Sequence, residues 1–438
     1  MEQDQAVELL RRISFTLVAG KARLEHWLTY AGLIEQAGEP AAARTVLEAI
    51  SQVRSRSSFL PPDMRLAVSG RSATPLDLIE ILIEIGEPQA ALKLLQGLKR
   101  FCNDSADLHF QLGTAFAVLG DARKAIASFK GAIERDSAHA DAHLRLGYLL
   151  TEKGQIGEGF EHFMARAQIV SGGNAHDGGG GAPLHKVRHD QEQREYLSSL
   201  GVPASAELFH LGDGERVPGP VVNPAHVEDA VLARWKDASP QLVVIDDFLT
   251  QPALEKLRSY CLESTVWHRI YDAGYIGATP ADGFACPLLA QLAEEIISRW
   301  PRIIGAHKFK YLGAFNYDSE LSRGTNIHAD LAAVNVNFYI TPDDANLNPA
   351  SGGIAVWNST IDSEPLMRQL NGSETAMRAY LSSRNAVVTT IPHRSNRAVI
   401  FKSNLIHKTD DCDFRKGYRN KRINVSLLFG EYGASTRG

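Results

Sequence analysis

The sequence has few cysteines, no long apolar run and no excess of positive charge. Its four cysteines are scattered over 438 residues without a CxxC pair, which argues against a disulfide framework or a zinc site and favours reduced thiols. No apolar stretch approaches the roughly 18 residues of a membrane span, and the N-terminus lacks the basic and apolar regions of a signal peptide. The net charge of −5 gives no basic surface for nucleic acid or membranes. We therefore expect a cytoplasmic protein that binds neither.

The first half of the chain contains an internal repeat. A length of 438 residues, with 44% hydrophobic and 22% charged residues, is ordinary for two or three globular domains. Residues 107–170 repeat with a period of 34 residues, and weaker copies precede them. The repeated positions are a Leu-Gly pair, a turn glycine and a large apolar residue: Leu112-Gly113 and Leu146-Gly147; Gly86, Gly120 and Gly154; Leu95, Phe129 and Phe163. Two apolar helical stripes broken by a glycine turn at this period resemble the tetratricopeptide repeat (TPR).

The TPR resemblance implies an α-solenoid over residues 1–170. Such stacks form a concave groove that usually holds a peptide or a partner protein. The alternative is that the helices only brace the rest of the chain or join two copies of it as a homodimer.

Residues 171–224 are expected to join the repeat domain to a second folded domain over 225–438. The stretch 171–183 is rich in glycine and the stretch 212–224 in proline and glycine, as in flexible linkers. Between them, residues 185–197 are polar and helix-like. His185 and His189 have the i, i+4 spacing of a pair of metal ligands, but the mixed charges favour a solvated, salt-bridged helix.

Of three His-x-Asp/Glu tripeptides, only one stands in a strand-like context. Roughly two such tripeptides are expected by chance from this composition. The tripeptide at 139–141 lies in the helical repeat, where residues i and i+2 point to different sides, and the one at 226–228 has no strand around it. His328-Ala-Asp330 is followed by 334–340, an alternating β-branched and aromatic run that predicts a strand. On an extended chain i and i+2 face the same way, so His328 and Asp330 can converge on one metal.

His407 and Arg422 follow on later strand-like runs. Two imidazoles and one carboxylate can hold Fe(II) on one face and leave the opposite positions open. A single buried histidine is more often a satisfied core residue than a ligand. His407 is therefore a candidate ligand only in combination with His328, Asp330 and Arg422.

The second half of the chain carries several motifs in a fixed order. A strand over 243–249 ends in Ile-Asp-Asp-Phe-Leu and leads into a helix over 251–264, and Gly352-Gly353 precedes a strand over 354–357. With the His328, Asp330, His407 and Arg422 order, these features resemble Fe(II)- and 2-oxoglutarate-dependent oxygenases of the prolyl-4-hydroxylase type over residues 242–431. The resemblance implies a double-stranded β-helix, or jelly roll. The whole chain is then a multidomain α + β protein.

The resemblance also implies a set of cofactors and their ligands. Fe(II) would be bound by His328, Asp330 and His407, with 2-oxoglutarate as co-substrate, O₂ as oxidant and ascorbate as reductant. The far carboxylate of 2-oxoglutarate suits a planar, bidentate cation, and this role carries over to Arg422. Arg419 is the rival, but it lies in the turn 417–421 rather than on the strand.

Tyr317, Asn337 and Tyr339 are further candidates for contact with 2-oxoglutarate. The alternatives are core packing for Tyr317 and hydrogen bonds to neighbouring backbone for the amides of Asn335 and Asn337. Phe338 stands where some family members place a tyrosine on the far carboxylate. This departure leaves Tyr339 or an asparagine as the substitute.

We expect a hydroxylase that acts on a side chain of a peptide or protein captured by the repeats. One alternative is a hydroxylase of a small-molecule or sugar-containing metabolite that uses the repeats for assembly. Another is a non-catalytic repeat scaffold with a degenerate barrel, although the complete His, Asp, His and Arg set argues against it. Residues 361–385 are polar and helix-like and are expected to form a substrate lid. His307 and His393 are expected to be structural or exposed.

Overall fold

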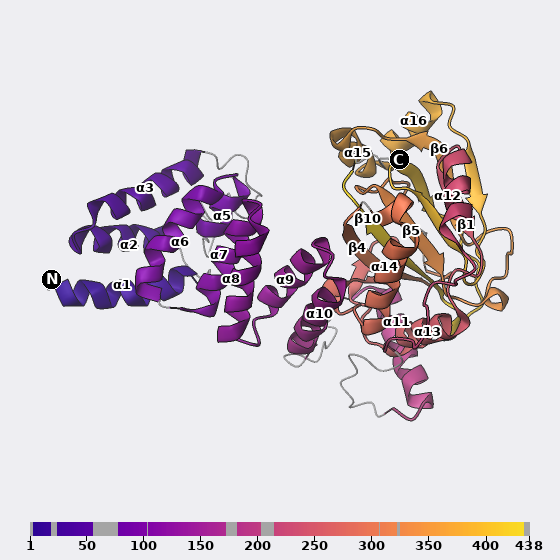
Figure 1. Ribbon diagram of the computed structural model, residues 1–438, viewed down its shortest axis with the longest axis horizontal. Helices are drawn as coiled ribbons and strands as arrows, with labels where there is room; N and C mark the ends of the chain where they lie inside the picture. The colour runs from indigo at the N-terminus through magenta and orange to yellow at the C-terminus, as the bar shows by residue number, and fades with distance from the viewer. Residues whose placement is uncertain are drawn as a thin grey trace. The chain divides into compact units, whose positions relative to one another are not determined.

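The computed structural model describes most of the chain in two compact units. The described residues are 3–18, 24–55, 78–102, 104–171, 182–202, 214–305, 307–321 and 325–432. One unit spans Met1–Leu149 and the other Leu150–Gly438, and Figure 1 colours the chain from indigo to yellow in this order. Within these described ranges, no helix combines the length and the apolar character needed to cross a lipid bilayer.

The first unit consists of packed helices. From α1 to α8 each described helix contacts the next, and α1 also contacts α6; one apolar core runs from the first of them to the sixth. The helical character predicted for this half of the chain is confirmed. The helices are α1 (Gln3–Val18), α2 (Leu24–Gln36), α3 (Pro40–Ser55), α5 (Leu78–Glu84), α6 (Pro88–Cys102), α7 (Ala106–Val118) and α8 (Ala122–Arg135), followed by α9 (Ala140–Glu152) at the division.

Gly113 and the turn glycines of the repeat have structural causes. Gly113 lies inside α7, and a Cβ at this position would come 2.6 Å from Cδ1 of Phe129 on α8. The missing side chain therefore allows the paired helix to approach. The turn glycines follow helix ends with φ between +77° and +87°, the left-handed region that glycine adopts without strain; they are Gly38, Gly86, Gly120 and Gly154.

The second unit is built on two antiparallel sheets. The larger has the strand order β1-β8-β5-β10-β4-β3-β2 and the smaller β7-β6-β9. Every strand predicted from the sequence overlaps an observed one. The strands are β1 (Leu242–Ile245), β2 (Arg269–Tyr271), β3 (Tyr275–Ala278), β4 (Phe309–Tyr317), β5 (Val334–Tyr339), β6 (Ile354–Thr360), β7 (Val388–Ile391), β8 (Ala398–Lys402), β9 (Leu405–Thr409) and β10 (Arg422–Phe429).

The two sheets share an apolar core, and helices cover the other face of the larger sheet. Ile354 of β6 lies in one buried cluster with Val399 and Phe401 of β8. On the opposite face, Phe338 of β5 packs 5.1 Å from Phe248 between ring centroids. The helices of this part are α12 (Glu228–Asp237), α13 (Gln251–Glu263) and α14 (Pro287–Arg299).

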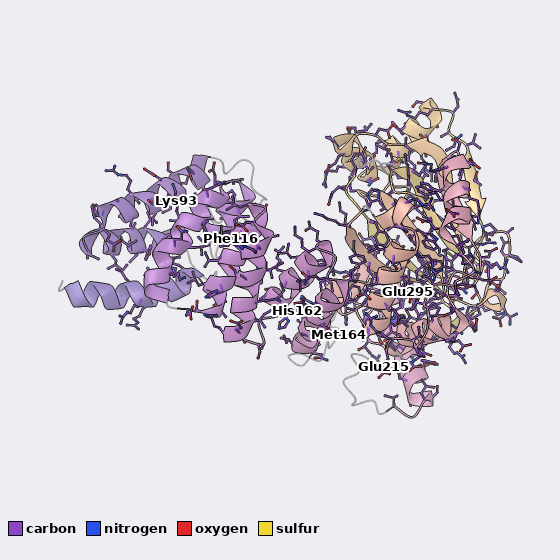
Figure 2. The ribbon with its side chains drawn as sticks, in the orientation of Figure 1. Lys93, Phe116, His162, Met164, Glu215 and Glu295 are labelled. Carbon is purple, nitrogen blue, oxygen red and sulfur yellow. The ribbon has the colours of Figure 1, made fainter. Side chains whose placement is uncertain are left out.

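By its contacts, α10 (Ile156–Ser171) belongs to the second unit. It packs along α14, and Arg166 donates a hydrogen bond to the carbonyl of Ala281. The segment before α12 is tied to the same helix, because the Glu295 carboxylate (Figure 2) accepts hydrogen bonds from the N–H groups of Val221 and Val222 at 2.7 and 2.9 Å. Residues 172–181 of the predicted linker lie outside the described residues. The domain ranges 1–170, 171–224 and 225–438 stay predictions.

The connecting helix α11 (Leu184–Ser199) buries one face instead of being solvated all round. His189, Gln193 and Leu197, each four residues apart, form the buried face. Gln193 Nε2 donates to the carbonyls of Leu262 and Ser264 at 3.3 and 3.1 Å. The prediction of a solvated helix over 185–197 is therefore wrong on this face, and His189 is a packing residue there.

Residues 361–385 form two helices that pack firmly on the sandwich. They are α15 (Glu364–Asn371) and α16 (Glu374–Ser383). Met367 and Met377, both 0% exposed, share an apolar core with Ile327 and Ala329 from the loop before β5. These helices therefore support the loop that carries His328 and Asp330. The substrate lid stays a prediction.

Candidate metal and co-substrate site

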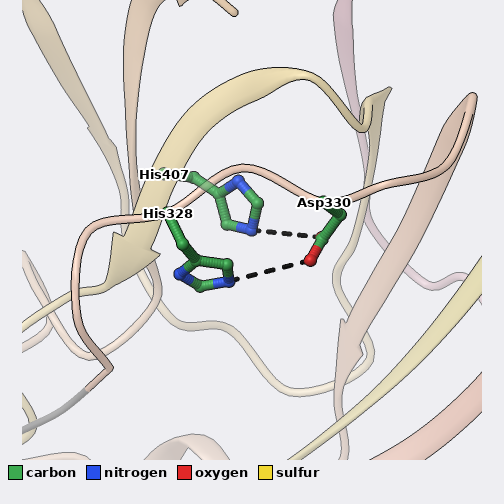
Figure 3. Close-up of side chains that lie close together, drawn as sticks. All are labelled: His328, Asp330 and His407. Carbon is green, nitrogen blue, oxygen red and sulfur yellow. Dashed lines mark ion pairs between the residues drawn. The ribbon is translucent and has the colours of Figure 1, made fainter. Parts of the chain in front are cut away.

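His328, Asp330 and His407 converge at one place in the second unit (Figure 3). One possible ligand atom from each residue lies within 4.8 Å of the other two. Asp330 Oδ2 is 3.5 Å from His407 Nε2, and Asp330 Oδ1 is 3.8 Å from His328 Nε2. Two imidazole nitrogens and one carboxylate on one side suit Fe(II). The residues present therefore fit the metal that the sequence suggested.

Hydrogen bonds fix which nitrogen of each imidazole faces the cluster. His328 Nδ1 lies 2.7 Å from the Asn326 carbonyl oxygen, and His407 Nδ1 lies 2.8 Å from that of Leu405. A carbonyl can only accept, so each Nδ1 carries the proton and each Nε2 presents its lone pair to the cluster.

Asn335 orients the carboxylate of the cluster. Its Nδ2 donates to Asp330 Oδ2 at 2.8 Å. The sequence predicted either contact with the co-substrate or a bond to neighbouring backbone for this amide. The observed partner is instead the side chain of the candidate ligand Asp330, so the amide lies at the site.

Burial keeps His407 in the form that binds metals. The residue is 5% exposed. Burial, reinforced by the neighbouring His328, lowers the pKa of His407 to about 4 against an opposing effect of Asp330. An imidazole must be neutral to bind a metal. His407 is therefore ready as a ligand at neutral pH.

The cluster lines a cavity of about 460 Å³ that also contains Arg422. Arg422 is 1% exposed. Its Nε and Nη2 donate to the carbonyls of Gly352 and Gly353 at 2.6 and 3.0 Å, and its Nη1 donates to Asn424 Oδ1 at 2.8 Å. The turn needs glycine, because a Cβ at Gly353 would lie 2.0 Å from the carbonyl oxygen of Ile391. The carbonyl groups of the Gly-Gly turn predicted from the sequence thus hold the buried guanidinium of Arg422 by hydrogen bonds.

Tyr317 and Tyr339 lie on either side of this guanidinium. Their ring centroids are 4.7 and 5.1 Å from Cζ of Arg422. The hydroxyl of Tyr317 lies 3.1 Å from Oγ1 of Thr409. The hydroxyl of Tyr339 is buried and donates to no acceptor among the described residues. A buried donor beside a buried cation favours an anionic ligand oxygen at this point.

The prediction that Phe338 stands in the place of a tyrosine on the far carboxylate is wrong. Phe338 packs on Phe248 at the helix-covered face of the sheet, because successive residues of a strand face opposite sides. Tyr339 lies on the face of Arg422. Of the two residues, Tyr339 is therefore the one whose ring lies beside the guanidinium.

Asn337 lines the cavity as part of a polar network on β5 and β10. Its Nδ2 donates to Ser426 Oγ at 3.0 Å, and its Oδ1 accepts from Asn424 Nδ2 at 3.3 Å. Asn424 and Ser426 were not predicted as site residues. The alternation on β10 could have found them, since residues 422, 424 and 426 share one face.

The remaining candidates lie outside the cavity. Arg419 is exposed in the short turn Tyr418–Asn420, so it is not the anchor in this geometry. His393 is buried between Tyr339 and Phe414, at 5.3 and 5.0 Å between centroids, and burial lowers its pKa to about 3. His307 is also buried.

Neither of the other two His-x-Asp/Glu tripeptides forms a ligand pair. His139 lies 3.7 Å from Asp107 rather than against Asp141. His226 bonds the carbonyl oxygen of Asp247 at 3.0 Å. Among the described residues, the tripeptide in the strand context is the one that contributes to a cluster of possible metal ligands.

An aromatic wall of the cavity was not predicted. It is formed by Tyr271 and Tyr275 of the β2–β3 hairpin and by Tyr311 and Phe315 of β4. The first two rings stack at 4.4 Å with an interplanar angle of 11°. The hairpin strands have only 3 and 4 residues, too few for a periodic signal in the sequence.

Comparisons with known proteins give weak likenesses in both halves. No protein-family model matches the chain, and no curated protein matches it in sequence. Among solved structures, the non-heme alpha-ketoglutarate-dependent carbocyclase SnoK from nogalamycin biosynthesis is 11% identical, with a TM-score of 0.38 over 49% of this chain and 87% of SnoK. The epimerase SnoN from the same biosynthesis is 12% identical, with a TM-score of 0.36 over 48% of this chain and 84% of SnoN.

The helical half is similar to YrrB, a TPR protein with an unusual peptide-binding site. The identity is 20% and the TM-score 0.22, over 32% of this chain and 75% of YrrB. Because all these TM-scores lie below 0.5, the likenesses do not establish a reaction or a ligand for this chain.

Proposed function

We propose that the second unit is an Fe(II)- and 2-oxoglutarate-dependent dioxygenase with a double-stranded β-helix, and that it hydroxylates a side chain of a peptide or protein. One observation carries the proposal. A single cavity is lined both by the converging donors His328, Asp330 and His407 and by the buried cation of Arg422.

Each of these residues has a separate role in the proposal. His328, Asp330 and His407 would hold Fe(II), which with 2-oxoglutarate and O₂ supplies oxidation of a C–H bond. Arg422 would bind the far carboxylate of 2-oxoglutarate, and the Tyr339 hydroxyl would be a second donor to it. Ascorbate would be the reductant that keeps the iron ferrous.

The environment of Arg422 supports a co-substrate with a carboxylate at this end. Three of the five N–H groups of a guanidinium donate to neutral acceptors here. No carboxylate among the described residues lies within ion-pair distance of it. Burying a charged group without an oppositely charged partner costs roughly several kcal/mol of free energy. A bound carboxylate would offset this cost, which makes the cavity selective for an anion at this end.

The direct test is conversion of 2-oxoglutarate to succinate. Purified protein would be supplied with Fe(II), ascorbate and 2-oxoglutarate, and offered candidate peptides and metabolites in parallel. We expect succinate to form slowly alone and faster with the true substrate, together with a mass increase of one oxygen on that substrate. Absence of both Fe(II) binding and succinate formation would contradict the proposal.

The repeat unit is proposed to capture the polypeptide substrate. Removal of residues 1–135 keeps every element from α9 onward, including α10 and α11, which pack on the sandwich. The shortened chain should lose about a hundredfold in kcat/KM for the peptide, since tethered capture raises the effective concentration of the substrate. Its slow turnover of 2-oxoglutarate without substrate should be unchanged. Equal kcat/KM for the two chains would leave the repeats as an assembly or dimerisation element.

The aromatic wall favours a second candidate, the hydroxylation of a small metabolite. Stacked tyrosine rings suit a planar or sugar-like molecule as well as an apolar side chain. In this case the full and shortened chains should turn over the metabolite equally, and peptides should not stimulate succinate formation.

A further inference from the structure

Asn371, the last residue of α15, is hydrogen-bonded to the loop that carries two of the candidate metal ligands. Its Oδ1 accepts from the N–H of Ala329 at 3.1 Å, and its Nδ2 donates to the carbonyl of the same residue at 2.8 Å. Ala329 is the residue between His328 and Asp330. One side-chain amide thus satisfies both backbone groups at the centre of the ligand tripeptide.

The two other residues of the tripeptide bond to the opposite side. His328 exchanges two backbone hydrogen bonds with His407, at 2.9 and 2.8 Å. The N–H of Asp330 donates to the carbonyl of Ser403 at 2.8 Å. The tripeptide therefore has a strand-like neighbour on one edge only, and on the other edge the Asn371 amide takes the place of a second strand.

The side chains explain why this edge needs a polar partner. Ala329 is 2% exposed and its methyl group lies in the core formed with Met367 and Leu370 of α15. A buried backbone N–H and carbonyl must be paired, and no strand among the described residues pairs with Ala329. Because side chains alternate along an extended chain, holding Ala329 in the α15 core directs His328 and Asp330 together toward the cavity.

We propose that Asn371 is a positioning residue for the metal site, which sets the spacing of His328 and Asp330 through the backbone of Ala329. The inference rests on the proposed metal function. Asn371 does not line the cavity and is not one of the candidate metal ligands. Its effect should therefore appear in metal affinity, with 2-oxoglutarate binding at Arg422 much less affected.

The test uses the full chain with Asn371→Ala and Asn371→Asp. Asparagine and aspartate have the same shape, but a carboxylate opposite the Ala329 carbonyl cannot donate to it and repels it. Both variants should bind Fe(II) about tenfold more weakly in an anaerobic titration, within the range common for groups that orient metal ligands. The KM for 2-oxoglutarate at saturating Fe(II) should stay within about twofold of the value for the unsubstituted protein, because changes at separate sites without shared partners have nearly independent effects.

Asn358→Ala is the matched control. The Oδ1 of Asn358 also accepts a backbone hydrogen bond, from Val387 at 2.8 Å, and neither of these two residues lines the cavity. The control should lower the melting temperature of the apo protein at most and leave Fe(II) affinity unchanged. His407→Ala serves as the reference for loss of a ligand.

The outcomes separate this inference from the proposed function. Weaker Fe(II) binding in both Asn371 variants, with a normal Asn358→Ala, supports the positioning role. Normal Fe(II) affinity in Asn371→Asp overturns it, even where Asn371→Ala is unstable. If His407→Ala also binds Fe(II) normally, the metal site itself is misassigned and the proposed function fails with it.

Discussion

Replacement of His407 by alanine should abolish Fe(II) binding at the cluster and, with it, the conversion of 2-oxoglutarate to succinate. The substitution removes one of two imidazole donors and leaves a gap beside Asp330. Loss of a group that only orients a metal ligand costs about 10- to 100-fold in affinity or activity. Loss of the ligand itself should therefore exceed about 100-fold by the same scale. An anaerobic Fe(II) titration and a succinate assay on the same preparation measure the two effects.

His307→Ala is the matched control for this experiment. His307 is similarly buried, at 6% exposure against 5% for His407, and burial lowers the pKa of His307 too. It does not line the cavity. This variant should keep Fe(II) affinity even where its melting temperature falls. Full turnover by His407→Ala would exclude this histidine from the metal site.

Strand periodicity explains most of what the sequence predicted about this site. The alternation of Val334, Asn335, Val336 and Asn337 identified β5 and one polar face, and both asparagines lie on the cavity side. The same alternation, carried two residues further, places Tyr339 on that face and Phe338 on the other. The error at Phe338 came from following the family resemblance at a position where parity along the strand was the stronger argument.

Contacts between distant segments could not be predicted in this way. The buried face of α11 is formed by His189, Gln193 and Leu197, of which only the last is strongly apolar. A hydrophobic period therefore gave no signal, and the helix was interpreted as solvated. The pairing of Asn371 with Ala329 depends on a tertiary contact between the end of α15 and a loop that lies 42 residues earlier. No local sequence pattern predicts such a contact.

Replacement of Arg422 by alanine should weaken 2-oxoglutarate binding by roughly 30-fold or more and leave Fe(II) affinity intact. Removing one partner of a buried, hydrogen-bonded charge pair costs about 2–5 kcal/mol, and the lower figure corresponds to about 30-fold. Arg422 lines the same cavity as His328, Asp330 and His407 but is not one of the candidate metal ligands. Titration of 2-oxoglutarate into the Fe(II)-loaded protein, beside the Fe(II) titration, separates the two affinities.

Two further variants separate the position of the charge from its geometry. Arg419→Ala removes an exposed cation only three residues away and should leave 2-oxoglutarate affinity unchanged; if it, and not Arg422→Ala, weakens binding, the anchor is misassigned. Arg422→Lys keeps the charge but loses the planar fork that bonds Gly352 and Gly353. The lysine variant should therefore show most of the loss of 2-oxoglutarate affinity. Normal affinity in this variant would mean that the charge alone binds the co-substrate, without the planar guanidinium and its hydrogen bonds to the Gly-Gly turn.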